Sequence, residues 1–102
     1  MIFNTTYTMS ASEERQFCIW MTECMMPAIA SGGVMHGLRL LRVLSHQQEE
    51  SVSYCLQQEV DSAQALHEWY LTEGTRWAEE CRRIFGDRVI GFSTLLEEVH
   101  HS

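Results

Sequence analysis

Apolar and polar residues alternate along the chain with two different periods, and these periods predict six secondary-structure elements. Residues Ile2–Met9 are rich in β-branched and aromatic side chains, which is typical of a β-strand. The stretches Ser51–Val60 and Val89–Leu96 alternate with the period of two that a half-buried strand requires. The stretch Val34–Leu44 alternates too, but the pair Leu40-Leu41 interrupts it and predicts a β-bulge, since both leucines would seek the core.

A first helix is predicted between the first two strands. The segment Ser10-Ala-Ser-Glu13 has the pattern of a capping box, in which the serine and glutamate side chains satisfy free backbone N–H groups. We expect Pro27 to kink or end this helix, because proline has no N–H for the preceding turn, and Ser31-Gly32-Gly33 to terminate it. Its apolar stripe has spacings of three and four and contains Phe17, Trp20, Met21, Cys24, Met25 and Ala28.

A second helix is predicted to follow the capping segment Asp61-Ser62-Ala63-Gln64 and to stop at Phe85-Gly86-Asp87. Gly74 lies on its apolar face. Because a glycine inside a helix costs about 1 kcal/mol relative to alanine, we expect Gly74 to permit a bend or a close approach. The apolar stripe of this helix contains Ala63, Leu66, Tyr70, Trp77, Cys81 and Ile84.

The order of elements is therefore βαββαβ, which corresponds to two split β-α-β units in a single domain over residues 1–102. Right-handed crossovers place both helices on one face of a four-stranded antiparallel sheet and give the strand order 4-1-3-2. The prediction is a ferredoxin-like α+β fold, with the first strand in the middle of the sheet and a polar tail after the last strand.

The two faces of this sheet differ in character. We expect one face to pack on the helices through Phe3, Tyr7, Leu38, Leu40, Val52, Tyr54, Leu56, Ile90 and Phe92. The opposite face would then carry Ile2, Asn4, Thr6, Thr8, Arg39, Leu41, Val43, Ser53, Cys55, Gln57, Val89, Gly91, Ser93 and Leu95. This mixed face is too apolar for an ordinary solvated surface and too polar for a second core. We therefore expect another subunit or a ligand to cover it.

Two interpretations of the mixed face stay open. The simpler one is a homodimer interface, whose polar groups are satisfied across the contact or by water. The more specific interpretation is a pocket between two sheets, in which Asn4, Arg39 and Gln57 hold an anionic or carbonyl-bearing small molecule. The candidate ligand-binding residues are Asn4, Thr6, Arg39, Cys55, Gln57 and Ser93.

Charge and composition argue against several kinds of partner. The 102 residues carry a formal net charge of −7, and the basic residues are all arginine. We expect no nucleic-acid or anionic-membrane partner, because both need clustered cations. The longest apolar region, Phe17–Ala30, is too short and too interrupted to span a bilayer, and no signal peptide is recognisable. These observations predict a cytoplasmic protein.

Cysteine and histidine are placed without a catalytic or metal-binding pattern. The cysteines at positions 18, 24, 55 and 81 form no C-x-x-C pair, which favours free thiols. We expect Cys24 and Cys81 to be buried on the helix stripes, and Cys55 to lie on the mixed face. The histidines are scattered over a strand, a loop, a helix and the tail, so we expect no metal and no cofactor.

Four segments carry a resemblance to a known family: M-I-F-N-T-T-Y at the start, G-L-R-L-L-R-V-L, S-V-S-Y-C-L-Q, and F-G-D-R-V-I-G-F-S-T-L-L-E-E-V near the end. The chain resembles, almost end to end, the small bacterial family called domain of unknown function 4286. Such proteins are similar in outline to dimeric α/β-barrel domains, whose protomers pair sheet to sheet. Some of those domains are cofactor-independent oxygenases or haem-degrading enzymes. The resemblance implies a fold and a dimer, but it transfers no catalytic residue.

The sequence leaves two functions open. One is a non-enzymatic homodimeric module that binds a ligand or partner through the sheet face. The other is a cofactor-independent enzyme of the dimeric α/β-barrel type, with its pocket between the two sheets. An enzyme needs a proton-transfer or oxyanion-stabilising group in its pocket. The mixed face offers Asn4, Arg39, Cys55 and Gln57, with His36 at its rim and no carboxylate, which favours the binding module.

Overall fold

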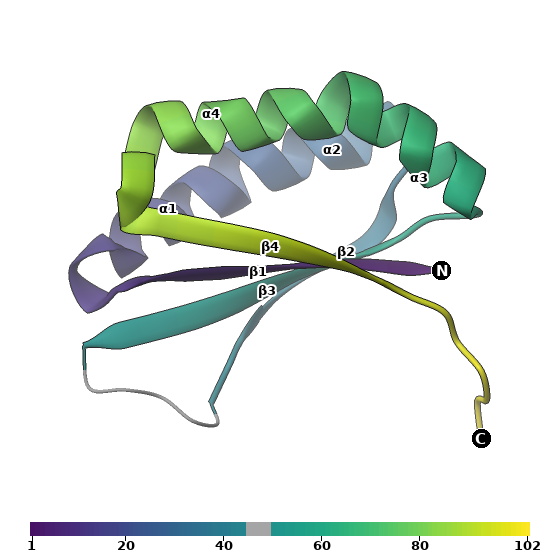
Figure 1. The fold of residues 1–102 in the computed structure, drawn as a ribbon, viewed down its shortest axis with the longest axis horizontal. Coiled ribbons are helices and arrows are strands. Elements are labelled where there is room, and N and C mark those ends of the chain that lie inside the picture. Colours follow the sequence, from purple (N-terminus) through teal and green to yellow (C-terminus); the bar gives the residue numbers. More distant parts are fainter. Residues whose placement is uncertain (45–49) are drawn as a thin grey trace.

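A twisted sheet and two long helical segments make up two layers in the computed structural model, which describes residues 1–44 and 50–102 (Figure 1). The described strands are β1 (Ile2–Ser10), β2 (His36–Arg42), β3 (Ser51–Glu59) and β4 (Val89–Leu96). They are antiparallel and lie in the order β2-β3-β1-β4, which is the predicted order 4-1-3-2 read from the other edge. The ferredoxin-like α+β prediction is confirmed. The polar segment Ser45–Glu50 is predicted from the sequence to be a hairpin loop, and all of it except Glu50 lies outside the described residues.

Each helical segment consists of two α-helices joined by a π turn. The first contains α1 (Glu14–Trp20), the π turn Met21–Met25 and α2 (Met26–Gly32). The second contains α3 (Ala63–Trp69), the π turn Tyr70–Gly74 and α4 (Thr75–Phe85). Short 3-10 turns, Ala11–Glu13 and Gly86–Arg88, precede the first segment and follow the second. Both segments cover the same face of the sheet (Figure 1).

We expected Pro27 to kink or end the first helix, but the structure has a π turn just before it and the helix does not end there. The N–H of Met26 bonds to the carbonyl of Met21, five residues earlier, and the helix continues to Gly32. The extra residue in this turn rotates the following side chains by about 100°. The buried stripe therefore continues through Met25 and Ile29, and Cys24 is exposed rather than buried as predicted.

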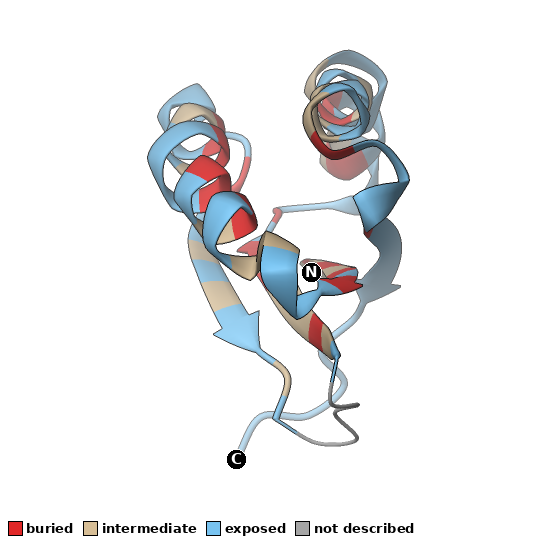
Figure 2. Ribbon diagram, turned by 90° about the vertical axis from the view of Figure 1, so that its left-hand side faces the viewer, coloured by how far each residue is buried: buried red, intermediate tan, exposed pale blue. Residues whose placement is uncertain are grey.

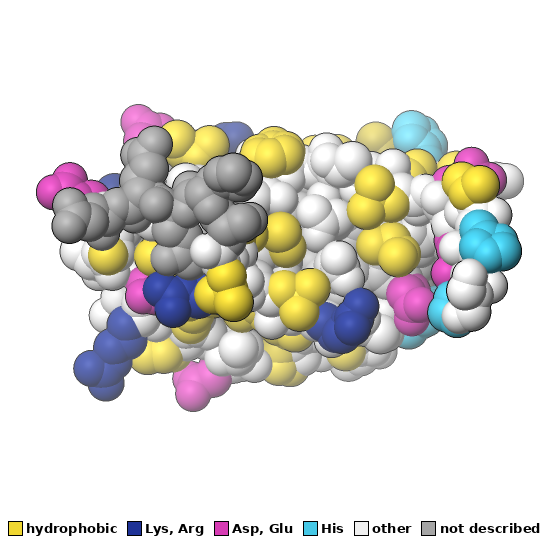
Figure 3. All heavy atoms as spheres, turned by 90° about the horizontal axis from the view of Figure 1, so that it is seen from below, with side chains coloured by type: hydrophobic (Ala, Val, Ile, Leu, Met, Phe, Trp, Pro, Cys, Tyr) yellow, Lys and Arg dark blue, Asp and Glu magenta, His cyan; other side chains and the backbone are white. Residues whose placement is uncertain are grey.

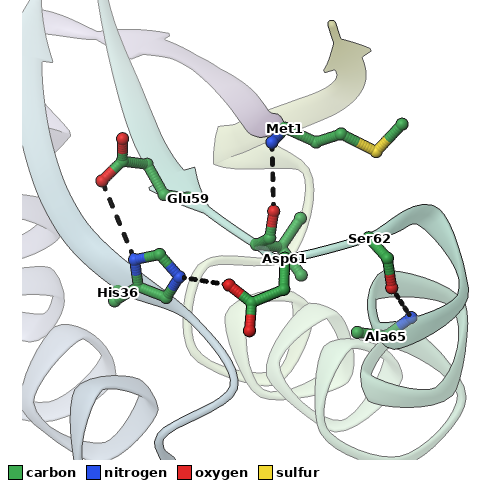
Figure 4. A network of polar contacts seen from close by, with 7 residues as sticks. Met1, His36, Glu59, Asp61, Ser62 and Ala65 are labelled. Atoms are coloured by element: carbon green, nitrogen blue, oxygen red, sulfur yellow. Dashed lines mark hydrogen bonds and ion pairs between the residues drawn. The ribbon is translucent and has the colours of Figure 1, made fainter.

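The two predicted helix caps have different outcomes. Ser10 precedes the first segment without a side-chain capping bond, and its hydroxyl instead bonds to that of Ser12 at 2.9 Å, so the predicted capping box is wrong. Ser62 does cap α3, because its Oγ accepts a hydrogen bond from the N–H of Ala65 at 3.0 Å (Figure 4).

Polar contacts tie the start of β1 to the end of β3 beside this cap (Figure 4). The backbone nitrogen of Met1 donates to the carbonyl of Val60 at 3.1 Å, and the N–H of Val60 donates to the carbonyl of Met1 at 2.9 Å. The ring of His36 lies between two carboxylates, with Nε2 3.1 Å from Asp61 Oδ1 and Nδ1 3.8 Å from Glu59 Oε2. These contacts fix the register of the central strands at one end of the sheet.

The core lies between the sheet and the inward sides of the helices (Figure 2). Phe17 is fully buried at its centre. The ring centroid of Phe17 lies 5.1 Å from that of Tyr7, 5.9 Å from Tyr54 and 6.1 Å from Phe85. One aromatic side chain of the first helix thus contacts two strands and the second helix, and this packing holds the layers together.

Strand β4 faces the opposite way from our prediction. Its residues pair with β1 so that Val89 lies opposite Met9 and Gly91 opposite Tyr7. Because directly paired residues of antiparallel strands point to the same face, Val89 turns toward the helices and is buried. Ile90 and Phe92 point away from the helices and are 65% and 62% exposed. The sequence V-I-G-F-S has apolar residues at both odd and even positions. Alternation alone therefore does not determine which side of β4 faces the helices.

The predicted bulge at Leu40-Leu41 is also wrong. Leu40 pairs with Leu56 and Leu41 with Cys55 in regular register, so the two leucines point to opposite faces. The irregularity lies earlier, between His36 and Arg39, where Gly37 has a φ of 59°. Leu41 belongs to the face away from the helices, which is itself partly apolar.

At Gly74 the steric cost of a larger side chain can be compared with alanine's higher helix propensity. A Cβ atom at this buried position would lie 2.8 Å from Cδ2 of Tyr70 and 3.0 Å from Cζ3 of Trp69. We expect Gly74→Ala to lower the free energy of unfolding by about 1–3 kcal/mol, because the aromatic rings must shift. Urea denaturation measures this change.

The matched control is Gly32→Ala at the end of α2, where a new Cβ would meet only the side chain of Glu73, no closer than 3.4 Å. That variant should be neutral or slightly stabilised. A Gly74→Ala protein more stable than the wild type would show that the rings do not constrain this position.

Candidate functional site

The sheet has an open face, which we define as its surface turned away from the helices (Figure 3). Apolar side chains are spread over this face among small polar groups (Figure 3). The strand pairing places on it Ile2, Asn4, Thr6, Thr8, Ser10, His36, Arg39, Leu41, Ser51, Ser53, Cys55, Gln57, Glu59, Ile90, Phe92, Thr94 and Leu96. Arg39 and Glu59 are the charged residues of this set, although the chain carries a net charge of −7.

The structure brings five of the predicted site residues onto the open face. Thr6 lies at the centre, with its Oγ1 3.5 Å from Cys55 Sγ and 3.5 Å from Asn4 Nδ2. On the neighbouring strands, Arg39 Nη2 donates to Gln57 Oε1 at 3.0 Å. The Oδ1 of Asn4 is buried and has no hydrogen-bond partner among the described residues. The role of these side chains in binding stays a prediction.

Ser93, the sixth predicted site residue, lies on the other face. It pairs with Thr5, and the two hydroxyl oxygens are 2.9 Å apart on the side of the sheet that faces the helices. This correction follows from the facing of β4 described above. Ser93 therefore does not join Asn4, Arg39 and Gln57, but borders a different feature.

That feature is a cavity of about 620 Å³ between β1, β4 and the second helical segment. Its volume falls in the usual range of small-molecule pockets. Six of the chain's ten aromatic residues line it, namely Phe3, Tyr7, Trp69, Tyr70, Trp77 and Phe92. Other lining residues include Thr5, Gln58, Ala78, Cys81, Gly91 and Ser93. This cavity is not predictable from the sequence, because its aromatic residues come from separate elements and show no local motif.

Three side chains that line the cavity carry a buried polar atom without a hydrogen-bond partner among the described residues. They are Gln58 through Oε1, and Trp69 and Trp77 through Nε1. Gln58 is only 1% exposed. Leaving such an atom unpaired costs roughly 1–3 kcal/mol, so these positions are expected to gain partners from a bound molecule or from water.

Burial keeps two titratable groups of the cavity, the Cys81 thiol and the Tyr7 hydroxyl, neutral at physiological pH. Burial raises the pKa of the Cys81 thiol to about 11, and the nearby Arg82 only partly opposes this effect. Burial likewise raises the pKa of the Tyr7 hydroxyl, with a smaller contribution from Cys81. The charged residues that line the cavity, Arg82 and Asp87, are exposed at its margin. The interior is therefore suited to an uncharged molecule.

Metal-binding clusters and membrane-spanning helices are two further features relevant to function. Within residues 1–44 and 50–102, no group of three or more His, Cys, Asp or Glu side chains is arranged to hold a metal ion. The helices of this described part are all too short or too polar to cross a membrane.

Comparison with known proteins assigns the chain to a family. The model of the family described as "Domain of unknown function (DUF4286)" matches residues 1–99. The chain belongs to this family. The DUF4286 description states no activity, and no curated protein matches the sequence.

Solved structures show where the DUF4286 fold recurs. One is an "ethyl tert-butyl ether d (ethd) family protein" from Bacillus halodurans, with a TM-score of 0.66 and 10% identity over 95% of this chain and 100% of that one. Another is from Deinococcus radiodurans, and its proposed identity is an antibiotic biosynthesis monooxygenase. It has a TM-score of 0.65 and 11% identity over 100% of this chain and 98% of that one. At such identities the similarity establishes the fold alone.

The cysteines should differ sharply in reactivity. Cys24 is exposed, whereas Cys81 is half-buried and its pKa is raised to about 11. At pH 8 we expect iodoacetamide to modify Cys24 rapidly and Cys81 at least about tenfold more slowly, since the thiolate is the reactive form. Peptide mapping by mass spectrometry measures both rates on the native protein.

Modification of Cys81 should accelerate as the pH approaches 11, because deprotonation then becomes favourable. Denatured protein is the control, in which the two sites should react at similar rates. Equal rates in the native protein would mean that the cavity wall does not shield Cys81.

Proposed function

We propose that this protein is a homodimeric binding domain that holds a small uncharged organic molecule in the cavity between β1, β4 and the second helical segment. The observation that carries the proposal is the cavity itself, about 620 Å³ in volume and walled by six aromatic side chains. The aromatic rings supply apolar contact area. The hydroxyls of Thr5 and Ser93 and the amide of Gln58 supply hydrogen-bonding groups that can orient the ligand.

Binding is favoured over catalysis by the state of the cavity's titratable groups. Tyr7 and Cys81 both have raised pKa values, so neither provides an anionic base or nucleophile near pH 7. The second candidate is an enzyme that acts on a small molecule in this cavity. It is motivated by the shared fold of the two solved proteins, one of which has a proposed monooxygenase identity.

The dimer belongs to the same proposal. Leu41, Ile90, Phe92 and Leu96 expose 40–65% of their surface on the open face, and two copies that met there would remove this area from water. Depletion of charge is typical of interface cores, and a two-fold axis would let one surface serve both copies. Asn4, Thr6, Arg39, Cys55 and Gln57 would then lie between the sheets, where they could hold a second polar ligand.

We further propose that residues 1–102 act as one domain in the cytoplasm. The four cysteines are unpaired, which is usual in a reducing compartment. The chain's net charge of −7 supports a partner other than nucleic acid or an anionic membrane.

Filling the cavity should abolish ligand binding. Ala78 lines the cavity on the exposed flank of α4. We expect Ala78→Phe to weaken binding of the neutral dye Nile red by about tenfold or more, because the new ring takes up space that the dye needs. Fluorescence titration measures the affinity.

The matched control is Ala63→Phe, since Ala63 is exposed on α3 and does not line the cavity. This variant should bind the dye like the wild type. If wild-type protein binds no dye, or if Ala78→Phe binds it unchanged, the cavity is not the binding site.

A charge on the open face should separate the two copies. Leu41 is 40% exposed on β2 and does not line the cavity. We expect Leu41→Glu to shift the protein from dimer to monomer in sedimentation velocity, since two buried carboxylates would face each other across the contact. Leu71→Glu, at a 61% exposed helical position, is the control and should stay dimeric. A wild-type monomer at millimolar concentration would refute the proposed dimer.

A further inference from the structure

Strand β4 takes part in both features described above, the cavity and the open face. It is an edge strand that pairs only with β1 among the described strands. Gly91 and Ser93 belong to its helix-facing side, whereas Ile90 and Phe92 belong to its open side, yet all four residues line the cavity. Ile90 and Phe92 line the cavity and are also exposed to solvent. The cavity therefore opens to the surface beside these two residues of the edge strand.

The mouth of the cavity is apolar and uncovered in a single copy. Ile90 and Phe92 expose 65% and 62% of their surface there. All eight residues of β4 are uncharged, and none is proline, so the strand lacks the features that usually protect a free edge from association. A ligand bound at this mouth would keep contact with water beside Ile90 and Phe92.

We propose that a second copy of the chain completes the ligand site by covering Ile90 and Phe92 at the mouth of the cavity. This inference rests on the proposed binding function and adds that one copy alone forms only part of the site. The second copy fits as the occupant because, among the described residues of the open face, which is continuous with the mouth, the charged ones are Arg39 and Glu59, with His36 beside Glu59. Two chains of net charge −7 repel least where they meet through such a surface.

The proposal couples ligand binding to dimerisation. A ligand that contacts both copies stabilises the dimer, and dissociation of the dimer lowers the ligand affinity by the same factor. Leu41→Glu tests this coupling, since Leu41 lies on the open face but is not among the cavity residues. We expect the Leu41→Glu monomer to bind Nile red about tenfold more weakly than the wild-type dimer, because the mouth loses one wall.

Two controls make the measurement specific to the cavity. Leu71→Glu carries the same substitution on an exposed part of the second helical segment, outside both features, and should keep the wild-type affinity. Ala78→Phe is introduced into the wild type and into Leu41→Glu, and dye whose affinity this substitution does not change is bound elsewhere, including on a newly exposed open face. This background is subtracted before the affinities are compared.

Dilution of the wild-type protein provides a second test without a mutation. Sedimentation gives the concentration at which the dimer dissociates, and the dye affinity of each copy should fall across that concentration. Equal cavity binding by monomer and dimer would overturn the inference while leaving the binding function intact. A wild-type dimer that binds no dye in the cavity would overturn the binding function, and the inference with it.

Discussion

Strand β1 is the constraint on which the two surfaces of this domain depend. It pairs along its whole length with β3 on one side and with β4 on the other. Because paired residues of antiparallel strands point to the same face, the alternation of Phe3, Thr5, Tyr7 and Met9 toward the helices orients both neighbours. The facing of β4 is set in this way. Gly91 lies beside the ring of Tyr7, whose Cδ1 and Cε1 would be 3.1 Å from a Cβ at that position.

The same constraint separates two environments across one sheet. On the side of the helices, Tyr7 and Cys81 border a space whose charged lining residues, Arg82 and Asp87, are exposed at its margin. Hydrogen bonding inside it relies on hydroxyl, amide and indole groups. On the other side, hydroxyl and thiol groups such as those of Thr6 and Cys55 lie among leucine, isoleucine and phenylalanine. The proposed ligand site and the proposed dimer surface are thus distinct, and both include residues of β4.

The strand order could be predicted from the sequence, because the period of the apolar residues indicates which segments are strands and which are helices. β1 and β3 alternate cleanly, and the βαββαβ order leaves few handed arrangements. The facing of β4 was not predictable from its own residues, since Val89 and Ile90 are equally apolar and only the register with β1 distinguishes them. Because β4 was predicted with the opposite facing, Ser93 was assigned to the wrong face of the sheet, and the cavity beside it was not predicted. The exposure of Cys24 was not predicted, because a stripe with spacings of three and four assumes an uninterrupted α-helix. The π turn Met21–Met25 interrupts that helix.

The paired π turns have a consequence for how the chain can change in length. Each contributes one residue more than an α-helical turn, at Met21–Met25 in the first segment and Tyr70–Gly74 in the second. Removing one residue from the second turn would restore a regular helix but rotate α4 by about 100°. Trp77 and Cys81 would then leave the cavity, although every residue of the cavity wall would still be present in the sequence. The spacing between Trp69 and Trp77 is thus as much a part of the site as the side chains themselves.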